Sequence, residues 1–152
     1  EFSLPELVQS VLRQMEPLRK SGQQLRHRHS GGSTLVLDPG LLKNILINLI
    51  SNAIKFSPEK STITIITKIE GEDITIQVCD EGLGISKEDQ QHLFERFFRG
   101  ANVTNIQGTG LGLHIVSRYV QLMNGSISCQ SELNAGTTFT IRFKQHKFEY
   151  DG

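Results

Sequence analysis

The sequence of 152 residues has few cysteines, no tryptophan and no excess of either charge. The two cysteines, Cys79 and Cys129, lie far apart in strand-like segments, which indicates buried thiols and not a disulfide or metal site. Its 16 basic and 16 acidic residues balance, so we expect no nucleic-acid surface and no direct membrane contact. No apolar run approaches the roughly 18 residues of a membrane span, and no signal peptide is visible.

The length bounds the organisation of the chain. It suffices for one domain, over residues 1–152, with a good hydrophobic core. No internal repeat or low-complexity tract divides the sequence. We therefore look for function in short motifs within a single domain.

A helix is predicted over residues 41–56, and polar side chains interrupt its apolar surface at regular spacing. Asn44, Asn48 and Asn52 recur every fourth residue and Lys55 follows, so all four share one helix face. Asparagine is a poor helix former, and these amides could simply cap or bridge neighbouring loops. Aligned with a lysine, however, they indicate the floor of a metal–phosphate site, because amide oxygens suit Mg²⁺ and lysine meets phosphate charge.

Two strands are predicted over residues 61–69 and 73–79, joined as a hairpin. The second leads directly into Asp80, Gly82 and Gly84. Glycines at the end of a buried strand allow a ligand to approach the backbone closely. Asp80 would be held there with little freedom, although taken alone it could be an ordinary acidic turn residue.

A second glycine-rich segment, residues 108–113, follows a polar stretch over 100–107 that we expect to be a mobile loop. Exposed N–H groups at the start of the next helix would suit phosphates. The segment lacks the Gly-Lys-Ser/Thr of a P-loop and the spacing of a dinucleotide fingerprint, so alone it is weak. The core face of that helix is predicted to comprise Ile115, Val116, Tyr119, Val120 and Met123.

Caps and turns predict the remaining elements. Ser3 and Glu6 form a capping box at the start of a helix. Asp38 and Pro39 begin the central helix, as N-cap and first helical residue. Residues 134–136 are the predicted turn of a last hairpin.

Five motifs occur in one order, and together they are far more specific than any one alone. They are Leu42–Pro58, Asp80–Ile85, Phe94–Arg99, Gly108–Leu113 and Gly136–Phe139. With them the sequence resembles, over nearly its whole length, the catalytic ATP-binding domain of sensor histidine kinases in the GHKL superfamily. The resemblance implies an α/β two-layer sandwich: a mixed sheet of about five strands packs against three main helices, and a flexible lid covers ATP.

The resemblance also implies how adenine and metal would be held. Asp80 would accept a hydrogen bond from the adenine amino group, and Thr137 would reach the adenine edge. Asn52 would bind Mg²⁺ through its side-chain oxygen, with Asn48 beside it. The full set expected to bind ATP is Asn52, Lys55, Phe56, Asp80, Gly82, Gly84, Ile85, Arg99, Gly108, Thr109, Gly110, Leu111, Gly112, Leu113 and Thr137.

The expected catalytic group is Asn48, Lys55 and Arg99, of which the last two would contact phosphates. ATP-hydrolysing relatives in the superfamily carry a glutamate where this sequence has Asn48. An amide cannot act as a general base. Phosphoryl transfer rests mainly on positioning and charge neutralisation, so such a site suits transfer to a nucleophile from elsewhere.

In the family, that nucleophile is a histidine on a separate helical dimerisation domain, and an acidic residue follows it. None of the five histidines here fits, because the residues after them are Arg28, Ser30, Leu93, Ile115 and Lys147. We therefore expect a fragment of a larger, membrane-tethered kinase that lacks its phosphoacceptor domain. The domain would face the cytosol, with a response regulator receiver domain as the downstream partner.

Other functions fit the same motifs. A GHKL protein-serine kinase that acts on a transcription regulator would have a similar ATP site. A nucleotide-sensing module could bind ATP and dock a partner without transfer. A GHKL hydrolase fits least well, because of Asn48.

Overall fold

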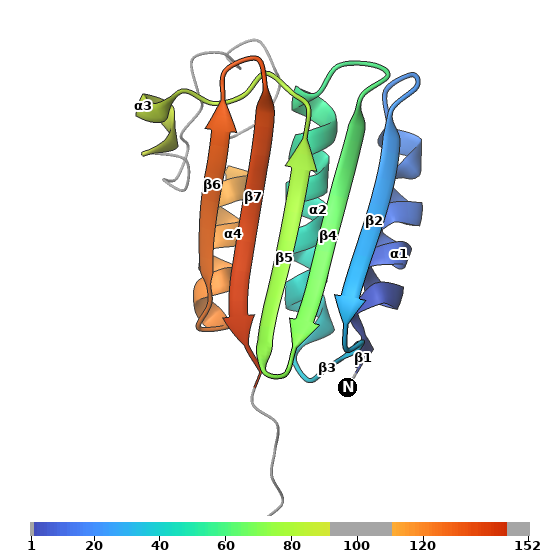
Figure 1. Ribbon diagram of the computed structural model, residues 1–152, viewed down its shortest axis with the longest axis vertical. Helices are drawn as coiled ribbons and strands as arrows, with labels where there is room; N and C mark the ends of the chain where they lie inside the picture. The colour runs from blue at the N-terminus through green and yellow to red at the C-terminus, as the bar shows by residue number, and fades with distance from the viewer. Residues whose placement is uncertain (1, 92–110, 146–152) are drawn as a thin grey trace, which may run out of the picture.

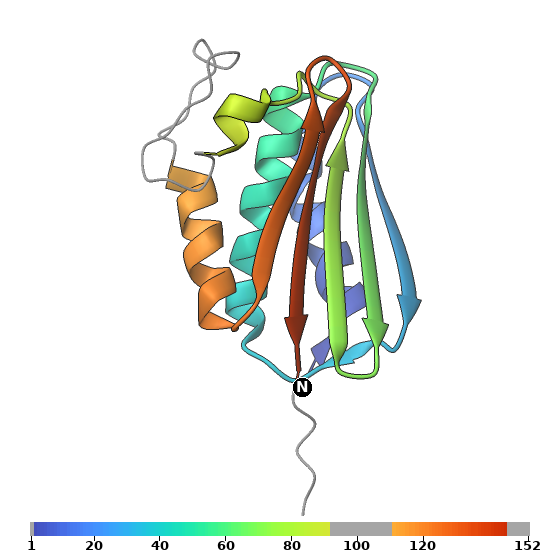
Figure 2. The same cartoon turned by 60° about the vertical axis from the view of Figure 1, so that its left-hand side comes forward.

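The protein forms two layers, with helices covering one face of a five-stranded sheet (Figures 1 and 2). The computed structural model describes residues 2–91 and 111–145. The strands are β1 (Phe2–Ser3), β2 (Gln24–Gly31), β3 (Thr34–Leu35), β4 (Thr62–Glu70), β5 (Asp73–Asp80), β6 (Ser126–Glu132) and β7 (Gly136–Lys144). The helices are α1 (Leu4–Met15), the 3-10 turn η1 (Glu16–Leu18), α2 (Pro39–Phe56), α3 (Lys87–Gln90) and α4 (Leu111–Leu122).

The sheet is mixed, as predicted. Its strand order is β2-β4-β5-β7-β6; β2 pairs with β4 in parallel and the other neighbours are antiparallel. Short turns at Gly71 and Asn134, both at positive φ, close the β4–β5 and β6–β7 hairpins. The predicted α/β sandwich with three main helices is therefore confirmed.

Local capping begins the helices where the sequence predicts. The Ser3 hydroxyl accepts a hydrogen bond from the Glu6 amide at 3.4 Å, and the Asp38 carboxylate accepts one from the Gly40 amide at 2.8 Å. Ser86 does the same for α3 through the Asp89 amide.

Helix α2 lies between α1 and α4 and carries the largest share of the core (Figure 1). Its fully or nearly buried residues are Leu42, Ile45, Leu46, Leu49, Ile50, Ala53 and Ile54. Alternating apolar residues of β4, β5 and β7 face it from the sheet. The apolar contacts of α2 fix its position, so its polar stripe is held on a rigid element.

Two details differ from the sequence expectations. Residues 34–35 pair with residues 2–3 as a separate two-stranded ladder; the sequence predicts a short strand over residues 34–37, but not its partner at residues 2–3. Ile115 was expected in the core face of α4 but is 36% exposed, whereas Val116 and Val120 are buried. Ile115 stands about 100° around the helix from Val116, beyond the edge of the stripe that meets α2.

Within the described ranges, no helix combines the length and apolar character that crossing a membrane requires.

Candidate functional site

Asp80 is the last residue of β5 and lies directly opposite Thr137 of β7 in the antiparallel register. Its Oδ1 accepts a hydrogen bond from the Gly82 amide at 2.9 Å, and the Thr137 backbone also hydrogen-bonds the carboxylate. Burial raises the pKa of Asp80 above its ordinary value, and the two backbone hydrogen bonds oppose that rise. The result is an oriented, partly desolvated carboxylate whose remaining acceptor capacity suits an amino donor.

The glycines after Asp80 are required by packing within the protein itself. A Cβ on Gly82 would stand 2.5 Å from the Phe56 carbonyl oxygen, at the end of α2. Gly84 has φ +75°, and a Cβ there would overlap the Glu132 carbonyl. The predicted contact of these glycines with adenine therefore remains a prediction, because the fold already explains them.

A hydroxyl network fixes the strand ends beside Asp80. Ser131 Oγ accepts from the Ile85 amide at 2.7 Å and donates to the Gly136 carbonyl at 2.8 Å. Its single proton is thereby used, so the Thr137 hydroxyl must donate in the 2.8 Å contact between the two side chains. Thr137 is only 6% exposed and keeps acceptor capacity for a ligand donor or a water.

The polar stripe of α2 is present, and its three amides differ. Asn44 donates to the Gly40 carbonyl at 3.0 Å and Asn48 donates to the Asn44 carbonyl at 2.8 Å. Asn52, half-buried, makes no side-chain hydrogen bond to any described residue. Lys55 is exposed at the end of the same stripe. Among the described residues none occupies the Asn52 amide oxygen, which is the donor that the Mg²⁺ assignment requires.

The predicted site residues gather at one end of the sheet. In both views the Asp80 end of β5, the Phe56 end of α2, the β6–β7 turn and the first residues of α4 lie at the same end (Figures 1 and 2). Leu111 begins α4, and Leu113 packs against the core. Four predicted residues lie outside the described ranges, namely Arg99, Gly108, Thr109 and Gly110.

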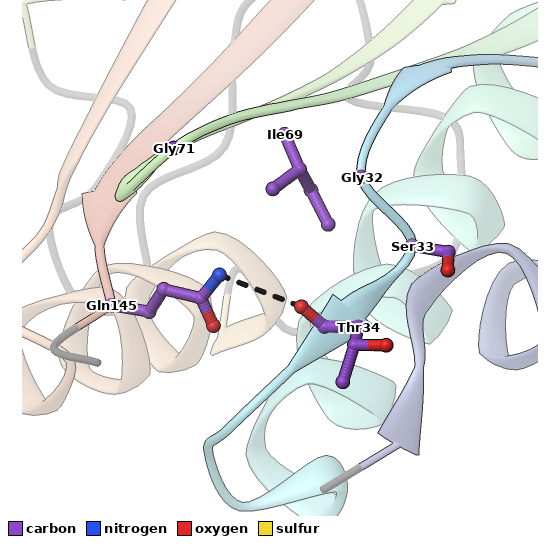
Figure 3. Close-up of a pocket in the computed structure, with 6 residues that line it drawn as sticks. All are labelled: Gly32, Ser33, Thr34, Ile69, Gly71 and Gln145. Carbon is purple, nitrogen blue, oxygen red and sulfur yellow. Dashed lines mark hydrogen bonds between the residues drawn. The ribbon is translucent and has the colours of Figure 1, made fainter. Parts of the chain in front are cut away.

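A cavity of about 270 Å³ lies at the opposite end of the sheet (Figure 3). Its lining comprises Gly32, Ser33, Thr34, Ile69, Gly71 and Gln145. Gln145 closes one side of it by donating to the Thr34 carbonyl at 3.4 Å. Among the described residues that line it, none carries a charged side chain, so these residues cannot neutralise a phosphate.

Two residues that sequence reasoning missed close the end of α2. Lys20 Nζ donates to the carbonyl oxygens of Lys55 and Ser57, at 2.8 and 2.7 Å. The Gln23 side chain, 1% exposed, donates to carbonyls of the same segment. Both lie in a polar stretch without local pattern, so only the folded contact reveals them.

The described residues contain no group of three or more His, Cys, Asp or Glu side chains that could hold a metal ion. His27 and His29, a His-x-His pair, both contact the Thr67 hydroxyl, at 2.8 and 2.7 Å. A divalent ion would therefore rely on neutral amide and phosphate oxygens, as the Asn52 assignment supposes.

Comparison with known proteins places the chain in one family. The family described as histidine kinase-, DNA gyrase B-, and HSP90-like ATPase matches residues 37–147. The histidine-protein kinase ArlS of Staphylococcus haemolyticus is 34% identical over 146 residues, which are 95% of this chain and 32% of ArlS. The sensor-like histidine kinase SenX3 of Mycolicibacterium smegmatis is 42% identical over 117 residues, which are 76% of this chain and 30% of SenX3. The chain thus spans about a third of the length of these relatives.

Solved structures agree with the sequence relatives. The nucleotide-free catalytic domain of the histidine kinase ThkA has a TM-score of 0.82 at 27% identity, covering 95% of each chain. Full-length ShkA, solved in complex with AMPPNP, has a TM-score of 0.83 at 29% identity, covering 95% of this chain and 31% of ShkA. The sensor histidine kinase MprB shares the fold, with a TM-score of 0.82 at 23% identity and 97% coverage of each chain.

Proposed function

Because the chain belongs to the family of histidine kinase-, DNA gyrase B- and HSP90-like ATPases, we propose that it is the catalytic domain of a sensor histidine kinase. It binds Mg-ATP and transfers the γ-phosphoryl group to a histidine on a separate dimerisation domain. The named relatives with the greatest coverage are histidine kinases, and they favour this branch of the family over the serine kinases and the hydrolases. The whole of residues 1–152 acts as this one domain.

The observation that carries the proposal is the position of Asp80. A carboxylate at the end of a central strand, held by two backbone amides, is a fixed acceptor for an exocyclic amino group. The buried Thr137 hydroxyl beside it is oriented as a second acceptor. Together they suit the exocyclic amino group of adenine, whose two N–H bonds can be shared between the carboxylate and the hydroxyl, directly or through a water.

The stripe on α2 supplies the contacts for metal and phosphate. Asn52 would hold Mg²⁺ through its amide oxygen, and the ammonium group of Lys55 would meet a phosphate. Bound Mg²⁺ neutralises phosphate charge, which is the main demand of phosphoryl transfer. Arg99 and the segment 108–113 complete the phosphate contacts in this proposal, by the family resemblance.

Asn48 determines what the site does not do. Its amide donates to the Asn44 carbonyl, and an amide cannot remove a proton from water. Water is therefore a poor acceptor of the phosphoryl group, and in this proposal transfer requires a nucleophile that another domain positions. That domain is the histidine-bearing dimerisation domain, and the phosphorylated histidine then serves a response regulator.

The cellular location of the domain follows from the proposal that it belongs to a sensor histidine kinase. In this proposal the domain lies on the cytosolic side of a membrane-bound sensor kinase, tethered to its dimerisation domain. The chain itself contributes neither a membrane contact nor a nucleic-acid surface.

Titration calorimetry with different nucleotides tests base recognition. We expect Mg-ATP to bind and Mg-GTP to bind at least about tenfold more weakly, because guanine presents a carbonyl where adenine presents its amino donor. The nucleotides carry the same triphosphate, so GTP is the matched control for phosphate binding. Equal affinities for Mg-ATP and Mg-GTP would contradict the role of Asp80 in reading the base. If neither nucleotide bound, the proposed function would be wrong.

A further inference from the structure

The last turn of α2 ends in backbone carbonyls that cannot be paired within the helix. The segment after η1 supplies donors to them. Lys20 Nζ binds the Lys55 and Ser57 carbonyls at 2.8 and 2.7 Å, and Gln23 Nε2 binds the Ser57 and Pro58 carbonyls, both at 3.1 Å. A cation at this position also opposes the negative end of the helix dipole.

The supplying segment is itself held in place. Gln23 Oε1 accepts from the Lys20 amide at 2.8 Å, so both ends of the Gln23 side-chain amide are used. Arg19 Nη1 donates to the Gln23 carbonyl at 2.8 Å, and the Lys60 amide donates to the Ser21 carbonyl at 3.0 Å. Residues 19–23 therefore form a compact clamp, which we call the α2 clamp.

The clamp is connected to the adenine end of the site through the Phe56 carbonyl. Phe56 O lies between the clamped carbonyls of Lys55 and Ser57, and it accepts a hydrogen bond from the Leu83 amide at 3.2 Å. The same oxygen contacts the backbone so closely at Gly82 that no side chain fits there. The position of Phe56 O at the end of α2 thus sets the position of the loop that begins with Asp80.

We propose that Lys20 and Gln23 are positioning residues for nucleotide binding. They bind the carbonyls on both sides of Phe56 and so fix Phe56 O. Through the Leu83 amide, Phe56 O holds the Asp80–Ile85 loop in register with the α2 stripe. Neither residue touches nucleotide in this assignment. The inference rests on the proposed function, because it assigns these residues to the adenine end of that site.

The test compares Lys20→Met, Lys20→Arg and Lys43→Met with the unchanged chain. Lys43 is an exposed lysine near the start of α2, without a part in the clamp, and serves as the matched control. The affinity for Mg-ATP is measured by calorimetry, well below the melting temperature of each variant. Amide exchange, measured by NMR, is followed at Leu83 and at Ile76 in the middle of β5.

We expect Lys20→Met to weaken Mg-ATP binding roughly three- to tenfold and to speed exchange at Leu83 by a similar factor, leaving Ile76 unchanged. Lys20→Arg, which keeps a cation with several donors, should restore both values, and Lys43→Met should change neither. Gln23→Met, where it folds, should resemble Lys20→Met.

A clamp that only stabilises the helix end would give a different result. Lys20→Met would then lower the melting temperature while Mg-ATP affinity and Leu83 exchange stayed at their original values, and the proposal would be wrong. If the unchanged chain bound no nucleotide, the proposed function would fail, yet Leu83 exchange would still decide whether Lys20 positions the loop.

Discussion

The Asp80 carboxylate combines three properties that a base-reading group needs. It is partly desolvated, it is held by two backbone amides, and it ends a strand in the middle of the sheet. Burial strengthens the hydrogen bonds that the carboxylate accepts, and the same burial raises its pKa. By contrast, Asp73, at the other end of β5, is exposed, and its carboxylate lies 3.8 Å from the exposed ammonium group of Lys144.

Replacing Asp80 by asparagine should therefore weaken nucleotide binding without unfolding the protein. Loss of a buried charged acceptor costs about 1–3 kcal/mol, which is roughly ten- to a hundredfold in affinity. Calorimetric titration with ATP measures this, and Asp73→Asn is the control on the same strand, expected to bind as the original does. Equal affinity for Asp80→Asn and the original chain would contradict the assigned contact.

The three asparagines of α2 share a stripe but not a role. Asn44 and Asn48 tie their amide groups back to the carbonyl one turn earlier, and Asn52 makes no such bond among the described residues. Since α2 is held by apolar contacts on its other faces, the direction of the stripe is set by the core.

Asn52→Ala should abolish the increase in ATP affinity that Mg²⁺ provides. Titrations with Mg²⁺ and with a chelator give that increase as a ratio, so a general loss of affinity is separated from a metal effect. Asn44→Ala, on the same face and two turns earlier, should keep the ratio of the original chain. An unchanged ratio in Asn52→Ala would mean that the metal ligand lies elsewhere.

At the scale of elements, the sequence predicts what local signals encode. The Asp38 cap, the turns at Gly71 and Asn134, and the apolar period of α2 each act within a few residues, and each prediction is confirmed. The β1–β3 ladder joins only two residues from each strand, too few for a pattern, and is fixed by long-range packing.

The residues of the candidate site likewise divide into those that local sequence signals predict and those that only the fold reveals. The positions of Asp80 and Thr137 were predictable because each belongs to a sequence motif at a strand end. Ser131, Lys20 and Gln23 were not, because each lies in a locally polar stretch and acquires its partners from segments distant in sequence. Position 82 likewise requires glycine because the Phe56 carbonyl, distant in sequence, lies against it. From the sequence alone, the spacing of Gly82 and Gly84 suggests contact with a ligand instead.

At the scale of the whole molecule, a polar chain joins α1 to the sheet on the far side from α4. The Gly32 carbonyl can only accept, so His29 carries its proton on Nε2 and accepts at Nδ1 from the Thr67 hydroxyl. Thr67 in turn accepts from His27 Nε2, and Gln9 of α1 donates to His27 Nδ1. A proton added at His27 Nδ1 would face the Gln9 Nε2 donor and break that contact.

This arrangement predicts that the protein loses stability in mild acid. Burial, and then the neighbouring His29, lower the pKa of His27 below its ordinary value of 6.5. The unfolded chain thus binds the proton more tightly, so the free energy of unfolding falls as pH drops below about 6.5. Denaturant unfolding at about pH 8 and about pH 5.5 should show a larger loss for the original chain than for His27→Gln. The same loss in both proteins would exclude His27 as the source.

The two ends of the sheet differ in their polar groups. One end gathers Asp80, Thr137 and the end of α2, and the other holds the uncharged cavity beside Gln145. In this proposal one end of the sheet binds nucleotide and none of the five histidines is a phosphoacceptor. The chain should therefore bind ATP, hydrolyse it slowly and not phosphorylate itself. Correct alignment of two reactants contributes roughly 7–11 kcal/mol at best, and here the second reactant must come from another domain.

The most direct test of this claim is phosphoryl transfer from γ-labelled Mg-ATP, with and without a histidine-bearing dimerisation domain supplied as a separate chain. We expect no label on this chain, slow release of phosphate, and acid-labile, base-stable label on the added domain. Transfer should be weak, because no tether raises the effective concentration. Strong labelling of this chain alone, rapid phosphate release, or no label on the added domain at any concentration would contradict it.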